Sequence, residues 1–285
     1  MAYDSPAALR AALEQRLQVE SQHSGIVVNR LRRRVVFERL VARLNHAEPG
    51  RWVVKGGMAL EVRLPDRART TKDLDLGLRA DGAEPGELRD RLIDALAADP
   101  DSDGFTFLVG PAAELGADEA GRNSWRFSVQ AALAGRAFDG LKLDVAPRAE
   151  ELEPTEQVLL QTALAFAGIE SRLVELIDVN RHAAEKVHAF TRTYSDRPSS
   201  RVRDVVDLVL LIENELLDNA RTVTALHAVF EQRATHELPS SLPSPPSFWI
   251  VQYANLVADL TVEARTLEAA LALLRDWWQQ LFSPA

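Results

Sequence analysis

Apolar residues recur every three or four positions over several stretches of the chain, which is the spacing of one face of an α-helix. Ser5-Pro6, ahead of the first such stretch, is typical of a helix start. The pattern predicts helices at 5–20, 26–45, 85–98, 181–190 and 201–219. A segment rich in Pro and Ser, 238–247, predicts an exposed connector before two closing helices.

A second pattern, strict alternation of apolar and polar residues, is typical of half-buried β-strands. It is clearest in residues 69–79 and 140–146. The apolar faces consist of Leu74, Leu76 and Leu78 in the first segment and of Leu141, Leu143 and Val145 in the second. The polar faces carry Arg69, Thr71, Asp73 and Asp75 in the first segment and Lys142 and Asp144 in the second. Further strands are predicted at 51–55, 104–109, 124–133 and 173–179.

These predicted elements are unevenly distributed along the chain. Strands and helices are interleaved as far as the turn-rich segment 147–154, whereas the pattern from 155 onward is mainly helical. We therefore expect an α/β domain at 1–150 and a mainly helical domain at 151–285.

The composition is that of an ordinary globular protein, with 46% apolar and 26% charged residues among 285. The sequence contains no cysteine, which excludes disulfides, thiolate metal sites and thiol nucleophiles. The N-terminus has no signal-peptide pattern, and charges interrupt every apolar run before about 18 residues, the length that a membrane span needs. We expect a cytoplasmic protein without a membrane span.

The net charge of −9 conceals an asymmetry. Residues 1–72 hold 14 Lys and Arg against 7 Asp and Glu, whereas residues 151–285 hold 11 against 19. The arginines of the predicted helix around 30–43, above all Arg30, Arg33 and Arg34, are candidates for binding an RNA backbone. A solvated amphipathic face accounts for the same arginines equally well, because Arg is common on helix surfaces.

Asp73 and Asp75 lie two residues apart on one strand face, where their charges repel each other unless a cation lies between them. Mg²⁺ prefers such oxygen ligands. Asp144 lies on the polar face of the second alternating strand, so three carboxylates converge if the two strands are neighbours. A triad of this kind suits metal-dependent nucleotidyl transfer, in which one carboxylate also takes the proton of the attacking hydroxyl. The alternative for Asp73 and Asp75 is a solvent-exposed strand face.

Lys55-Gly56-Gly57 joins a predicted strand to another helical pattern. Two glycines at such a turn expose backbone N–H groups that suit phosphate oxygens. A tight turn without a ligand is the alternative, since neither the Walker motif nor the dinucleotide-binding glycine motif is present.

Three spaced motifs follow one another within residues 55–212. They are Gly56-Gly57-Met58-Ala59-Leu60 with Arg69-x-Thr71-x-Asp73-x-Asp75, then Ala184-Glu185-Lys186, then Arg203-Asp204-Val205-Val206-Asp207-Leu208. In these motifs the sequence resembles the AbiEii/AbiGii (MenT-like) nucleotidyltransferase toxins of the polymerase-β-like nucleotidyltransferase superfamily. His188 departs from the resemblance, which favours an apolar or small residue there.

The resemblance implies a polymerase-β-like α/β (α+β) domain with a small mixed sheet, followed by a mainly helical domain that completes the active-site cleft. Nucleotide binding is then expected from Gly56, Gly57, Arg69, Thr71 and Lys186. The resemblance implies Mg²⁺ binding by Asp73 and Asp75, and the alternating strand at 140–146 adds Asp144 to them. The expected catalytic set is Asp73, Asp75, Asp144, Lys186, Asp204 and Asp207. All four lysines of the chain, Lys55, Lys72, Lys142 and Lys186, fall within or beside these motif and strand segments. Lys186 is the candidate for an ammonium that faces the triphosphate.

The resulting hypothesis is a Mg²⁺-dependent toxin of a toxin–antitoxin system. It would transfer a nucleotide from an NTP to the 3′ end of tRNA, block translation, and be silenced by an antitoxin protein. Two alternatives stand beside it. The acceptor is instead a hydroxyl of a protein or small molecule, or the chain is a non-catalytic NTP-binding module.

Overall fold

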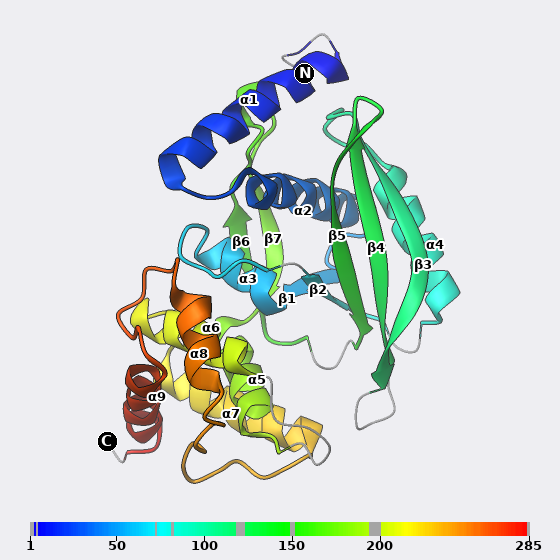
Figure 1. The fold of residues 1–285 in the computed structure, drawn as a ribbon. Coiled ribbons are helices and arrows are strands. Elements are labelled where there is room, and N and C mark those ends of the chain that lie inside the picture. Colours follow the sequence, from blue (N-terminus) through cyan, green and yellow to red (C-terminus); the bar gives the residue numbers. More distant parts are fainter. Residues whose placement is uncertain are drawn as a thin grey trace. The chain divides into compact units, whose positions relative to one another are not determined.

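The computed structural model describes residues 3, 5–71, 73–80, 83–117, 123–148, 152–193 and 201–283. It divides into two compact units (Figure 1). The sheet unit comprises Met1–Val62 and Thr70–Leu176, and the helical unit comprises Arg63–Arg69 and Ile177–Ala285. Within the described ranges, no helix has both the length and the apolar character needed to cross a membrane.

The helices of the sheet unit are α1 (Pro6–Ser24), α2 (Val28–Ala47), α3 (Gly56–Arg63) and α4 (Pro85–Ala97). α1 begins where the Ser5 hydroxyl accepts a hydrogen bond from the N–H of Ala8, and it ends at Gly25 in the left-handed conformation. α2 and α4 pack against each other and against the sheet, and α1 packs on α2. The helices predicted at 5–20, 26–45 and 85–98 are confirmed.

The sheet is mixed and has the strand order β3-β4-β5-β2-β1-β7-β6. Its strands are β1 (Trp52–Lys55), β2 (Asp73–Leu78), β3 (Phe105–Ala117), β4 (Asn123–Leu133), β5 (Arg136–Pro147), β6 (Thr155–Leu160) and β7 (Arg172–Ile177). β2 runs parallel to β5, and β1 runs parallel to β7. The pairs β1-β2, β3-β4 and β4-β5 are antiparallel. The two alternating strands of the sequence, β2 and β5, are therefore neighbours.

Three features of this unit differ from the sequence prediction. β2 begins at Asp73 rather than at residue 69, because the segment Arg63–Arg69 belongs to the helical unit. β6 lies where mainly helical structure is expected; as an edge strand of half-buried and exposed residues, it has no buried face to mark it in the sequence. The unit also extends beyond residue 150, because β7 pairs with β1.

The apolar faces of β2 and β5 form part of the core. Leu74, Leu76 and Leu78 are at most 2% exposed, and Leu141, Leu143 and Val145 are at most 5% exposed. Successive side chains of a strand point to opposite faces of the sheet. Burial of the leucine faces therefore directs the aspartates of both strands to the opposite face, where they are only partly covered.

The helical unit is built from α5 (Val179–Thr191), α6 (Val202–Glu213), α7 (Asn219–Arg233), α8 (Trp249–Val257) and α9 (Leu267–Phe282). The single helix predicted at 201–219 is wrong, because α6 ends at Glu213 and α7 starts afresh. Glu215 takes a left-handed conformation with φ 53°, which interrupts the helix. The Asp218 carboxylate then accepts a hydrogen bond from the N–H of Arg221 and begins α7.

Candidate active site

Three aspartates lie side by side on one face of the sheet unit. The parallel register of β2 and β5 places Asp75 opposite Asp144 and Asp73 opposite Lys142. Adjacent strands are about 4.8 Å apart, so carboxylates at opposed positions are close neighbours. The sequence made this convergence conditional on the two strands being neighbours, and the register meets that condition.

Arg126, on β4, lies among these carboxylates and was missed by the sequence analysis. It is the register partner of Asp144, and its guanidinium donates two hydrogen bonds to that carboxylate, Nε to Oδ1 at 2.7 Å and Nη2 to Oδ2 at 2.6 Å. The same Nη2 lies 3.8 Å from Oδ2 of Asp73. These hydrogen bonds to Asp144 raise the pKa of Arg126 above its ordinary value, so the guanidinium remains charged. The sequence does hold a signal for this position. Phe127 and Val129 are buried on one face of β4, so alternation places Arg126 on the opposite, polar face.

The glycine pair forms the junction between β1 and α3. Gly56 is left-handed with φ 59°, and a Cβ built on it would lie 1.8 Å from Oδ2 of Asp75. Only glycine satisfies both requirements, since a side chain is strained in this conformation and would also collide with the carboxylate. Lys55, one residue earlier, is opposite Asp75 in the antiparallel register. The start of α3, the Asp75 carboxylate and Lys55 are thus brought to one place.

The donor set suits Mg²⁺, because carboxylate oxygens are its preferred protein ligands. The arrangement of side chains is a different matter. Among the residues that the structure describes, no group of three or more His, Asp or Glu side chains is placed to hold a metal ion. Both oxygens of Asp144 accept hydrogen bonds from Arg126. The residue types and the strand register therefore suit a metal, but the carboxylates are not arranged around one here, because the Arg126 guanidinium holds Asp144.

A second cluster of predicted residues lies within the helical unit, around Asp207. This carboxylate is 0% exposed and accepts two hydrogen bonds from Arg69, each at 2.8 Å, and one from Lys186 at 2.6 Å. Lys186 also contacts Asp204 at 3.4 Å. Burial alone would raise the pKa of Asp207, but Lys186 and Arg69 outweigh it and the pKa is lowered. Burial would likewise lower the pKa of Lys186, but Asp207 and Asp204 raise it above its ordinary value.

These contacts sort the predicted residues of the helical unit into two groups. Asp207 is fully buried, so it holds Lys186 and Arg69 in place and offers no exposed oxygen to a ligand. The guanidinium of Arg69 donates two hydrogen bonds to Asp207 in a bidentate pair. Asp204 is partly exposed, and Lys186 commits two of its three N–H donors to acids. Thr71, in the sheet unit, donates its hydroxyl hydrogen to the backbone oxygen of Asp73.

Two of the three predicted RNA-binding arginines of α2 pair with an acid of α3. Arg30 and Arg34 both contact the buried carboxylate of Glu61 on α3, at 3.1 and 2.7 Å. Arg33 is half-buried. The expectation of a basic surface around 30–43 is wrong for its second half, because Arg39 and Arg43 are at most 1% exposed. A helix pattern that treats arginine as a surface residue does not detect such burial.

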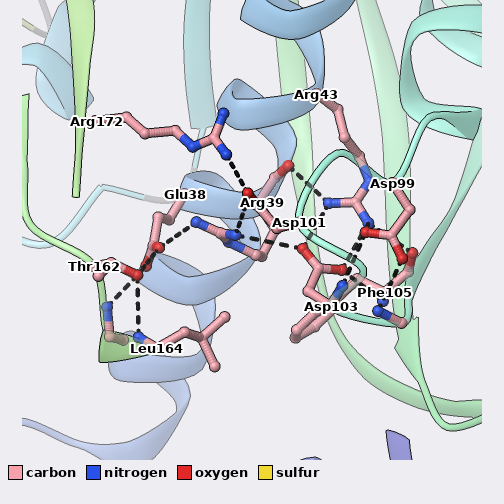
Figure 2. Close-up of polar contacts among 12 residues, drawn as sticks. Glu38, Arg39, Arg43, Asp99, Asp101, Asp103, Phe105, Thr162, Leu164 and Arg172 are labelled. Carbon is pink, nitrogen blue, oxygen red and sulfur yellow. Dashed lines mark hydrogen bonds and ion pairs between the residues drawn. The ribbon is translucent and has the colours of Figure 1, made fainter. Parts of the chain in front are cut away.

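Figure 2 shows why Arg43 is buried: it is enclosed by the loop that precedes β3. Its guanidinium contacts Asp99 at 3.1 Å, Asp103 at 2.7 and 3.0 Å, and the backbone oxygen of Phe105 at 2.9 Å. The loop has the sequence Asp-x-Asp-x-Asp-Gly, with Gly104 left-handed at φ 71°. This is the first half of the signature of EF-hand calcium loops, in which positions 1, 3, 5 and 7 supply the oxygen ligands. Arg43 therefore contacts positions 1, 5 and 7 as a cation.

Arg39 extends this network toward the other edge of the sheet. It contacts Glu38 at 2.5 Å and Asp101, the third position of the loop, at 2.8 Å (Figure 2). Asp101 also pairs with Arg172 at the start of β7, and Glu38 accepts a hydrogen bond from the hydroxyl of Thr162. A network of alternating charges thus connects α2 to the loop before β3 and to the residues between β6 and β7 and at the start of β7.

His188, which departs from the expected motif, is accommodated by an aromatic cluster in the helical unit. Its ring lies edge-on to Phe230 and 4.6 Å from the ring of His236, and its Nε2 is 2.8 Å from the hydroxyl of Thr235. Burial, followed by the positive charge of Arg233, lowers the pKa of His188 to about 3. The ring is therefore neutral at physiological pH and fills the core. Lys72, another residue noted in the sequence, lies outside the described residues.

Comparison with known proteins assigns the fold first to a class. MenT4, a nucleotidyltransferase toxin of Mycobacterium tuberculosis H37Rv, is similar over 94% of this chain and 90% of that chain, with 19% identity and a TM-score of 0.59. A putative nucleotidyltransferase from H. pylori is similar over 86% of this chain and 91% of that chain, with 17% identity and a TM-score of 0.46. No curated protein matches the sequence. The fold is that of a nucleotidyltransferase.

The family follows from the sequence itself. A model of the nucleotidyl transferase AbiEii toxins of type IV toxin–antitoxin systems matches residues 39–283, and the chain belongs to this family. The resemblance found in the three motifs and the predicted α/β fold class are both confirmed. Membership of a family of nucleotidyltransferase toxins implies an NTP as substrate and an antitoxin as partner.

Proposed function

We propose that this protein is a cytoplasmic toxin that transfers a nucleotide from an NTP to the 3′ hydroxyl of tRNA in a Mg²⁺-dependent reaction. The observation that carries the proposal is the register of β2 and β5, which sets Asp75 directly opposite Asp144, beside the Gly56 turn. Two opposed carboxylates next to a helix start provide acceptors for a metal or a proton and backbone donors for phosphate.

Each side chain has a task in this proposal. Asp73, Asp75 and Asp144 would hold Mg²⁺, which when bound supplies positive charge to the phosphates of the NTP. The N–H groups at the start of α3 would bind phosphate oxygens. A contact of Lys186 with the phosphates stays a prediction from the resemblance, because within its own unit this ammonium pairs with Asp207 and Asp204. Asp75 or Asp144 accepts the proton of the attacking hydroxyl. The hydroxyl oxygen forms a bond to the α-phosphorus, the bond to the β-phosphate oxygen breaks, and pyrophosphate leaves.

The test is incubation of the purified protein with each labelled NTP, total tRNA and Mg²⁺, followed by gel electrophoresis. We expect label in the tRNA band with the wild type and none with Asp75→Asn. Equal labelling by the two proteins would refute the roles given to the carboxylates. A chelator added to the wild-type reaction should abolish labelling, and labelling that persists would refute the metal dependence.

A second candidate acceptor is a hydroxyl of a protein or small molecule. The observation in its favour is the pairing of Arg30 and Arg34 with Glu61, together with the burial of Arg39 and Arg43, which leaves less basic surface on α2 than an RNA site needs. Label that appears in a protein band or in a small product, with unlabelled tRNA, would favour this acceptor. Mg²⁺-dependent NTP binding with no labelled product would favour a non-catalytic NTP-binding module.

A further inference from the structure

The guanidinium of Arg126 lies between two of the three aspartates that are proposed to hold a divalent cation. It takes both oxygens of Asp144 at 2.6 and 2.7 Å and approaches Asp73 to 3.8 Å. These two aspartates flank Asp75, one along the same strand and one on the neighbouring strand. The charge of Arg126 therefore already partly neutralises Asp144 and Asp73.

We propose that Arg126 is a resident counter-ion of the carboxylate site, and that a divalent cation must displace its guanidinium from Asp144 in order to bind. This inference rests on the proposed metal site and adds a residue that controls access to it. Three carboxylates side by side repel one another, and without a cation that repulsion would destabilise the sheet face. Arg126 relieves it in the metal-free protein.

The geometry favours competition over a shared site. A carboxylate oxygen that accepts a short hydrogen bond from a guanidinium is a weaker ligand, because part of its charge is already neutralised. The positive charge of Arg126 also repels a cation near Asp144. In this structure both oxygens of Asp144 accept hydrogen bonds from Arg126.

Arg126 is also placed so that it can leave. Its side chain is 30% exposed, in contrast to the fully buried arginine of the loop before β3. Because the pair is partly exposed, water can solvate the guanidinium once it leaves Asp144, which offsets part of the cost of breaking the bidentate contact. A divalent cation, with twice the charge and direct coordination, can therefore compete with it.

The inference is tested by Mn²⁺ binding to the full-length protein, measured from the electron paramagnetic resonance signal of free Mn²⁺. In Arg126→Gln we expect affinity to rise about tenfold, the effect of removing one positive charge at about 5 Å from a divalent ion in a water-like dielectric. The gain should shrink at high salt, because partly exposed charges are screened. Equal or weaker binding by Arg126→Gln would overturn the proposal.

Two further variants make the result specific. Arg79 forms another bidentate pair, with Glu175, and follows the end of β2 that is remote from Asp73. Arg79→Gln therefore removes the same charge away from the three aspartates. It should bind Mn²⁺ as the wild type does, and an equal gain there would show that net charge alone is responsible. In Arg126→Gln combined with Asp75→Asn the gain should vanish, and a gain that survives would place the ion elsewhere.

A measurement on the wild type does not depend on the folding of any variant. An arginine-specific reagent such as phenylglyoxal, read by peptide mass spectrometry, should modify Arg126 faster when Mn²⁺ is present, because the ion releases the guanidinium. An unchanged or slower rate would overturn the proposal. These readouts involve no transfer reaction, so they can succeed even if the proposed tRNA acceptor fails, and the labelling test can succeed even if they fail.

Discussion

Replacing Gly56 with alanine probes the close approach between the β1–α3 turn and the candidate carboxylates. The residue is left-handed with φ 59°, and the added Cβ would lie 1.8 Å from Oδ2, 2.7 Å from Cγ and 3.1 Å from Cβ of Asp75. A left-handed conformation costs a non-glycine residue about 1–2 kcal/mol. Reduced freedom of the unfolded chain offsets about 0.4–1 kcal/mol of this, which leaves a net loss of about 1 kcal/mol.

The collision adds a functional effect to this modest loss of stability. To reach ordinary van der Waals separation, the Asp75 carboxylate must move by roughly 1.5 Å. A displacement of that size at a reacting group lowers a rate by about 100-fold or more. We therefore expect Gly56→Ala to melt only a few degrees below the wild type and to lose nearly all nucleotide transfer.

Gly25→Ala is the matched control. Gly25 is also left-handed, with φ 74°, but an added Cβ has nothing within 4 Å. It should show the same loss of about 1 kcal/mol in thermal unfolding and retain full transfer activity. The reasoning is refuted if the two variants are equally active, because the close approach to Asp75 would then have no consequence for the reaction.

The remaining predictions concern buried charges. Asp207→Asn leaves Lys186 and Arg69 without their buried partner and should cost about 3–5 kcal/mol in urea unfolding. Because the pKa of Asp207 is lowered in the folded state, its contribution is present at neutral pH and lost as pH falls through that pKa, so acid should destabilise the wild type more than the variant. The pKa of His188 is lowered to about 3, so below about pH 6.5 the unfolded chain binds a proton that the folded chain does not. The free energy of unfolding should fall by about 1.4 kcal/mol between pH 7.5 and 5.5. Thermal melts of His188→Gln should not show this decrease. Arg43→Ala should lower the free energy of unfolding in urea by about 3–5 kcal/mol, because it leaves buried acids of the loop before β3 without their partner.

The part of the site that could be predicted from the sequence is the part that depends on local periodicity. Alternation alone puts Leu74 in the core and Asp75 on the open face, whatever the neighbouring strand is. The pairing of β2 with β5 was an additional assumption, supported by their common design, and the register confirms it. Arg126 lies on the polar side of β4 by the same alternation, but a lone arginine on a strand carries no local signal of its partner Asp144.

What could not be predicted depends on partners distant in sequence. Arg39 and Arg43 occur in a helix pattern that treats charge as exposed, and only the acids of a loop about 60 residues later make their burial tolerable. The edge strand β6 lacks a buried face, so its sequence does not alternate clearly between apolar and polar residues. Arg69 was assigned to the strand of Asp73, but its partner Asp207 lies in the helical unit to which Arg69 itself belongs.

In the loop around Arg43, the oxygens that resemble calcium ligands bind a side-chain cation, the Arg43 guanidinium, in place of a metal. A metal held by such a loop is in exchange with solution, so its occupancy follows the free concentration of the metal. A guanidinium tethered through the backbone of α2 has no such equilibrium, and the order of the segment before β3 is independent of the calcium level of the cell. A search for the first half of the calcium-loop signature would select this loop, although residue 110, where the full signature has Glu, is Gly. Arg43, which supplies the positive charge, lies far outside the motif.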